Sequence, residues 1–192
     1  MLRTISIAAA AFVSVAALSA QTAPPPDTFK VNYYSNANGA GPDATVQITN
    51  VGTSVGTTGD KDGDVCALIY VLKPDQQLTE CCGCLVTPDG LVTISVNLNL
   101  TSNPLSGGLP TSGDIKIVSS LPTVTGCNPV MPSPAAGIRA WGTHIQNDNS
   151  ITETAFLDAT LSAGELSGLV KGCKTAITEG SSAGVCSCGI GE

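Results

Sequence analysis

The chain has few charged residues, and very few of them are basic. Of its 192 residues only 12% are charged, and 8 Lys and Arg stand against 15 Asp and Glu, for a net charge of −7. Binding to nucleic acid or to an anionic lipid surface requires clustered Lys and Arg. The low share of charge also argues against a coiled coil or a charged solvating tail. The composition therefore excludes nucleic acid and anionic membranes as partners.

Side chains suited to catalysis are also scarce, since aromatic residues make up 4% of the chain and His144 is the single histidine. The segment from Gly52 to Gly56 has the spacing of a nucleophile elbow around Ser54. That motif works only between a buried strand and a helix, whereas loop sequence follows Ser54. A triad of Ser54, His144 and an Asp, with Asp148 four residues after His144, is therefore the weakest of the function hypotheses. We expect His144 to be a half-exposed strand residue instead. We expect no enzymatic activity and no catalytic residue.

The N-terminus has the pattern of an export signal. Arg3 precedes an apolar run from Ile5 to Leu18, which ends at the small residues Ser19 and Ala20. We predict a cleaved signal peptide over residues 1–20, a proline-rich leader over 21–27 and a single β-rich domain over 28–192. No later apolar run is long enough to span a bilayer, so we expect no membrane contact after cleavage.

The number of cysteines is even, which in an exported chain predicts disulfides rather than free thiols. The rival interpretation is a thiolate metal site, because residues 81–84 and 186–188 are tight cysteine clusters, although zinc ligands are more often spaced CxxC. Eight cysteines allow roughly a hundred pairings. We predict no free thiol, separate partners for Cys81 and Cys82, and a bridge from Cys173 to Cys186 or Cys188. The eight are Cys66, Cys81, Cys82, Cys84, Cys127, Cys173, Cys186 and Cys188.

Apolar residues recur with a period of two, which is typical of β-strands. The run from Val65 to Leu72 is almost continuously apolar, as in a central strand. Residues 91–100 alternate most regularly and predict one long strand. The turn Pro88-Asp89-Gly90 predicts a hairpin that joins the strands on either side of it. Seven to nine short strands with regular turns indicate a mainly β protein, a β-sandwich.

One helix is expected near the C-terminus, at residues 163–177. Ser162 and Glu165 form a capping box, and apolar residues follow at helical spacing until Gly180. Cys173 lies on the apolar face of this helix. We therefore expect a disulfide from the helix to the sheet or to the Gly/Ser/Cys tail.

Two segments carry ligand chemistry. Asp60, Asp62 and Asp64 alternate in a tight turn, and their oxygens suit calcium. Val65 stands where an EF-hand loop requires glycine, and a strand follows instead of a helix, so a solvated acidic turn is the alternative. Trp141 offers an aromatic platform for a glycan. No other cofactor is implied.

Several segments resemble a set of secreted, cysteine-rich acidobacterial proteins for which no function is established. The resemblance implies a bacterial protein that is extracellular or periplasmic, and it carries no catalytic or binding residue over to this chain. The segments are Cys66–Val71, Glu80–Cys84, Thr87–Leu91, Asn99–Leu105, Ile151–Thr154 and Cys186–Gly189.

Three function classes follow from these features. Low charge, abundant Gly, Ser and Thr, and covalent cross-links favour a non-catalytic extracellular structural or adhesive protein: a surface, matrix or filament subunit. A glycan- or calcium-binding module is the alternative, and a secreted hydrolase comes third. The segment from Thr28 to Tyr34 either pairs with a second copy of the chain as an edge strand or completes its own sandwich.

Overall fold

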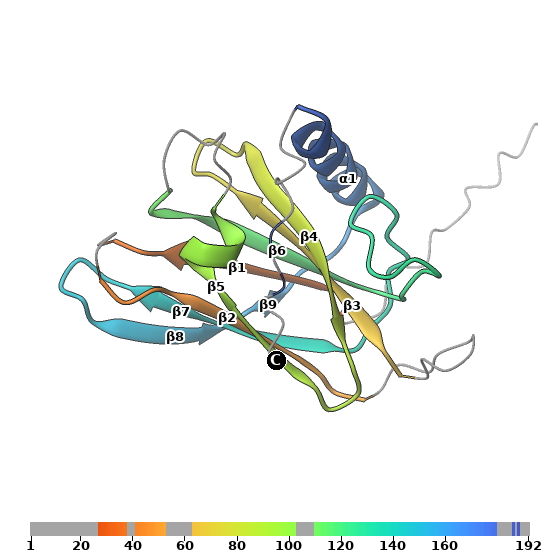
Figure 1. Cartoon of the computed structure of the whole chain (residues 1–192), viewed down its shortest axis with the longest axis horizontal. Coiled ribbons are helices and arrows are strands. Elements are labelled where there is room, and N and C mark those ends of the chain that lie inside the picture. The colour runs from red at the N-terminus through yellow and green to blue at the C-terminus, as the bar shows by residue number, and fades with distance from the viewer. Residues whose placement is uncertain are drawn as a thin grey trace, which may run out of the picture.

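The computed structural model describes residues 27–37, 41–52, 63–102, 110–179, 186 and 188. They form two antiparallel sheets packed face to face, with one helix against the outside of the larger sheet (Figure 1). This confirms the predicted two-sheet, mainly β fold. Sheet A has the order β4 (Leu78–Val86), β3 (Val65–Leu72), β6 (Ser112–Ser120), β1 (Phe29–Ser35) and β9 (Leu157–Asp158). Sheet B has the order β5 (Leu91–Ser95), β2 (Thr45–Asn50), β7 (Ile138–Ile145) and β8 (Ile151–Ala155).

The main core lies between the sheets, and a second apolar cluster lies outside sheet A. Strand β3 contributes to both, because Val65, Ala67 and Ile69 belong to the first cluster while Cys66 and Leu68 belong to the second. Successive side chains of a strand point to opposite faces, so a strand covered on both sides reads as a continuous apolar run. The run seen in the sequence therefore reflects burial on both faces of sheet A.

Helix α1 (Ala163–Thr178) provides much of that outer cover and confirms the helix predicted at residues 163–177. The Ser162 hydroxyl accepts a hydrogen bond from the Glu165 backbone N–H at 3.0 Å, as a capping residue does. Leu169 and Cys173 are buried on the side that packs against sheet A. Among the described residues, no helix combines the length and the hydropathy that a membrane crossing requires.

The segment 91–100 is not one strand, contrary to the sequence prediction. Strand β5 ends at Ser95, and a π-helical turn, η1 (Val96–Leu100), follows. The Ser95 hydroxyl accepts a hydrogen bond from Leu98 N–H at 3.0 Å, and the Asp43 carboxylate accepts one from Asn97 N–H at 3.1 Å. These two bonds satisfy N–H groups at the start of the turn, while Val96 and Leu100 remain buried. A local cap from Ser95 and a distant carboxylate from Asp43 thus outweigh the alternation of residues 91–100.

The predicted hairpin at Pro88-Asp89-Gly90 is also wrong, because β4 belongs to sheet A and β5 to sheet B. Asn50, at the end of β2, holds this turn: its backbone N–H donates to Gly90 O at 3.2 Å, and its backbone C=O accepts from Asp89 N–H at 3.1 Å. The buried Asn50 side chain also donates to Val86 O at 2.9 Å. The turn therefore delivers β5 to β2 rather than folding it back on β4.

All eight cysteines form disulfides, which confirms the prediction of no free thiol. The pairs are Cys66–Cys127, Cys81–Cys173, Cys82–Cys186 and Cys84–Cys188. Cys81 and Cys82 have separate partners, as predicted, but the predicted bridge from Cys173 to the tail is wrong. Cys81 faces the outside of sheet A, where α1 packs, whereas Cys82 belongs to the core between the sheets together with Cys186. Four disulfides indicate an oxidising, extracytoplasmic compartment.

Strand β1 contains the segment proposed as an edge strand. It pairs with β6 along its whole length and with β9 at Lys30 and Val31. In the structure this segment therefore completes the sandwich of its own chain, which is the second of the two predicted alternatives. Sheet B has two edge strands, β5 and β8, and all five residues of β8 are exposed.

Candidate functional site

The outer face of sheet B is the broad uncovered surface of the described sandwich. None of the residues that alternate outward on its four strands is buried, whereas α1 and the loop around Cys127 and Val130 pack on the outer face of sheet A. Figure 1 shows sheet B on the side of the sandwich opposite α1. The outward residues are Thr45, Gln47, Thr49, Leu91, Thr93, Ser95, Arg139, Trp141, Thr143, Ile151, Glu153 and Ala155.

Trp141 lies in the middle of this face. The register places it opposite Gln47 of β2 on one side and Ala155 of β8 on the other, and Gln47 in turn lies opposite Thr93 of β5. One row across the sheet thus holds a hydroxyl, an amide, an indole and a methyl group. Directly opposed residues have Cβ atoms about 5 Å apart, so these groups can contact one ligand together.

A second row runs beside the first and is entirely polar. The Thr45 and Thr143 hydroxyls lie 3.1 Å apart, and Thr143 also accepts a hydrogen bond from the Thr45 backbone N–H at 2.7 Å. Ser95 lies opposite Thr45, and Glu153 lies opposite Thr143. The face therefore combines one aromatic side chain with neighbouring hydroxyl, amide and carboxylate groups.

Arg139, at one end of β7, is already engaged in an ion-pair network. It pairs with Asp27, and Asp27 also pairs at 3.0 Å with Lys30, whose side chain is only 2% exposed. Lys30 has a second carboxylate partner in Asp158. The Arg139 hydrogen bond holds the pKa of Asp27 below its ordinary value. This network joins β1, β7 and β9, so we assign it to stability rather than to a ligand.

His144 is fully buried on the inward face of β7, not half-exposed as its place in a strand suggests. Its Nε2 lies 2.7 Å from the Thr154 hydroxyl, and its ring stacks on Tyr33 with centroids 4.0 Å apart. Burial lowers the pKa of the imidazole, which favours the neutral form. Its Nδ1 has no partner in the described structure, and the Asp148 carboxylate instead accepts from Ser150 N–H within its own turn at 2.9 Å. The structure thus forms no His144–Asp148 pair.

The remaining sequence candidates are only partly described. Ser54, Asp60 and Asp62 lie outside the described residues. Asp64 is half-buried and directly precedes β3. The calcium loop therefore stays a prediction.

A cavity of about 420 Å³ lies between α1 and the ends of β3, β4 and β6. Lys116 and Glu165 line it and form an ion pair with each other at 2.7 Å. A methyl group on Gly172 would meet the Leu78 side chain at 3.2 Å, so helix and sheet are in close contact there. The Lys116–Glu165 ion pair thus joins the helix to the sheet, and Asp114 is the third charged residue that lines the cavity.

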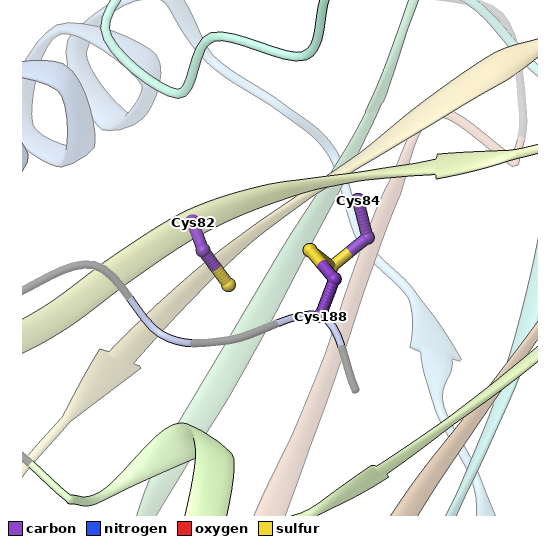
Figure 2. Close-up of side chains that lie close together, drawn as sticks. All are labelled: Cys82, Cys84 and Cys188. Carbon is purple, nitrogen blue, oxygen red and sulfur yellow. A yellow bond between two sulfur atoms is a disulfide. The ribbon is translucent and has the colours of Figure 1, made fainter. Parts of the chain in front are cut away.

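Four cysteines are linked in two disulfides where Cys186 and Cys188 of the C-terminal tail meet β4. The Sγ atoms of Cys82, Cys84 and Cys188 all lie within 4.8 Å of one another, and Figure 2 shows the disulfide between the last two. Cys186 completes the group through its bridge to Cys82. The two clusters that the sequence suggested separately as metal ligands are therefore brought together. The signal for this was their shared Cys-x-Cys spacing, because alternate residues of a strand such as β4 point to the same face.

The outer face of sheet B and the four-sulfur group are thus the two places where the chain concentrates recognisable chemistry. No family model, curated protein or solved structure matches this chain.

Proposed function

We propose that the chain is a secreted, non-catalytic adhesive or structural protein of a bacterium, and that it acts through the outer face of sheet B. The observation that carries the proposal is the position of Trp141, in the middle of an uncovered sheet face and in register with Gln47 and Ala155. Four disulfides hold the sandwich that presents this face, and they suit a protein that works outside the cytoplasm.

The chemistry of the face fits a polysaccharide. An indole can stack on the apolar face of a sugar ring, and its amphipathic character suits a surface that is partly wet. Gln47, Thr93 and Thr143 surround it with groups that donate and accept hydrogen bonds, as sugar hydroxyls require. A flat sheet face also offers several such rows to a repeating polymer, so weak contacts can add through multivalency.

Binding to insoluble polysaccharides tests the proposal. The exported protein should cosediment with at least one polymer of a broad panel. Trp141→Ala should weaken that binding by about tenfold, because one stacked aromatic contributes about 0.5–1.5 kcal/mol beyond the area that it buries. Met131→Ala is the matched control, since Met131 is 64% exposed and lies in the loop on the side of sheet A. Equal binding by both variants, or no binding to any polymer, would contradict a glycan-binding face.

A structural subunit is the second candidate, and the free edge of β8 favours it. All five residues of this strand are exposed, and Ile151 is 58% exposed at its start. Unpaired backbone groups on an edge strand can pair with another copy of the chain. Light scattering and negative-stain microscopy of the same samples distinguish the two cases: large regular assemblies that persist in Trp141→Ala would indicate a subunit rather than a glycan-binding adhesin.

A further inference from the structure

The four-sulfur group, Cys82, Cys84, Cys186 and Cys188, consists of two parallel Cys-x-Cys pairs. Strand β4 supplies one pair and the tail supplies the other, and the Cα atoms of the bridged residues are 5.1 and 5.4 Å apart. Cys82, Cys84 and Cys186 are at most 3% exposed, whereas Cys188 is half-buried. The other two disulfides do not share this arrangement, because Cys66 and Cys81 lie in the outer cluster of sheet A and each bridges to a different segment.

We propose that, once reduced, these four cysteines form a tetrathiolate site for a soft cation such as Zn²⁺. In a tetrahedral Zn–S₄ site with bonds of about 2.3 Å the sulfurs lie about 3.8 Å apart. Three of the four sulfurs already lie within 4.8 Å of one another while they are part of disulfides. Reduction would therefore leave three sulfurs at a spacing close to that of a coordination shell, with Cys186 beside them through its former partner Cys82. Thiolate ligands select Zn²⁺ or Cu⁺ over Ca²⁺ or Mg²⁺.

The site is conditional on a dithiol reductant, because a disulfide sulfur has no thiolate to offer. Each bridge takes up two electrons and two protons, and the dithiol is oxidised to its own disulfide. Two reduced bridges yield four thiols, and a divalent cation that binds four thiolates displaces four protons.

The geometry also provides an order for the reduction. Thiol–disulfide exchange requires access to a sulfur, and Cys188 is the least buried of the four. Opening of Cys84–Cys188 leaves both thiols within 4.8 Å of the Cys82 sulfur. The Cys188 thiolate can then attack the Cys82 sulfur, which releases Cys186 as a thiolate and forms a Cys82–Cys188 bridge. A second dithiol reduces this new bridge at Cys188 and leaves four thiols.

Metal retention by the full, exported chain tests the proposal. The oxidised protein is treated with a dithiol under native conditions, mixed with Zn²⁺ and desalted. We expect one zinc per reduced chain and almost none in the oxidised chain. Zinc should protect the four-sulfur group from alkylation, as mapped by mass spectrometry. Co²⁺ in place of Zn²⁺ should show the absorption of tetrahedral thiolate ligation.

Two matched variants complete the test. Cys84→Ser/Cys188→Ser leaves two ligands and should weaken zinc binding by more than about tenfold. Cys66→Ser/Cys127→Ser should bind zinc like the parent. Equal retention by both variants, no zinc in the reduced parent, or protection spread evenly over all eight cysteines would overturn the proposal. If the first variant does not fold, the alkylation map of the unmutated protein decides alone.

Discussion

Removing the Cys84–Cys188 bridge should destabilise the protein much less than removing Cys66–Cys127. In the chain-entropy view, a disulfide stabilises the folded state in proportion to the logarithm of the loop that it closes in the unfolded chain. Cys66–Cys127 spans 61 residues. Cys84–Cys188 spans 104 residues in sequence, but Cys82 is already bridged to Cys186 two residues away, so it closes only a ring of a few residues.

These ring sizes set the expected magnitudes. A loop of 61 residues corresponds to about 4 kcal/mol of unfolding free energy, and a ring of a few residues to about 2 kcal/mol or less. The two changes are otherwise matched, since Cys66 and Cys84 are at most 1% exposed and their partners are both half-buried. The cost of deleting buried sulfur atoms should therefore largely cancel in the comparison.

The assay is unfolding by heat and by urea, without reductant, of Cys66→Ala/Cys127→Ala and Cys84→Ala/Cys188→Ala. The second variant should retain about 2 kcal/mol more stability, which for a protein of this size is a difference in Tm of roughly 4–8 °C. An equal loss in both variants, or the reverse order, would refute the argument from ring size. It would mean that packing of the tail, rather than chain entropy, determines the effect of the bridges.

Two further predictions concern single side chains. Gly83→Ala should lower the free energy of unfolding by several kcal/mol, because the added methyl group would meet the Cys127 backbone. Gly168→Ala should raise it by up to about 1 kcal/mol, because no atom lies within 4 Å of the added methyl group on the exposed side of α1. Urea unfolding measures both, and an unchanged stability of Gly83→Ala would contradict the close packing. Burial lowers the His144 pKa below its ordinary value of 6.5, so below that pH the unfolded chain takes up a proton that the folded chain does not. The contribution of His144 to the free energy of unfolding should therefore be constant above about pH 6.5. Below that pH it should fall by up to about 1.4 kcal/mol per pH unit, down to the pKa of His144 in the folded protein. His144→Gln should remove this slope just below pH 6.5. Asp27 does not contribute there, because its lowered pKa acts only below 3.8. An unchanged slope would show that another group is responsible.

Part of the candidate site could be predicted from the sequence. The sequence predicts Trp141 as an aromatic platform, and the structure places it half-buried on the outer face of sheet B. Its neighbours could not be identified, because Gln47 is far away in the sequence and reaches Trp141 only through the register of β2 and β7. His144 was placed wrongly for the same reason: its burial depends on Tyr33 of β1, which crosses from the other sheet to stack on the ring.

By itself, the sequence determined the features that depend on neighbouring residues. The apolar period of two predicted the strands of the sandwich, and the capping box at Ser162 predicted the start of α1. The even number of cysteines predicted that none would be free. Only the tertiary structure decided where the chain goes after each turn and which cysteines pair. Hydrogen bonds from Asn50 hold the turn after β4, so that the next strand pairs in the other sheet. Cys82 lies on the inward face of β4 and therefore bridges to Cys186 of the tail rather than to α1. Such choices depend on groups that are distant in sequence and meet only when the sheets pack, so no local pattern contains them.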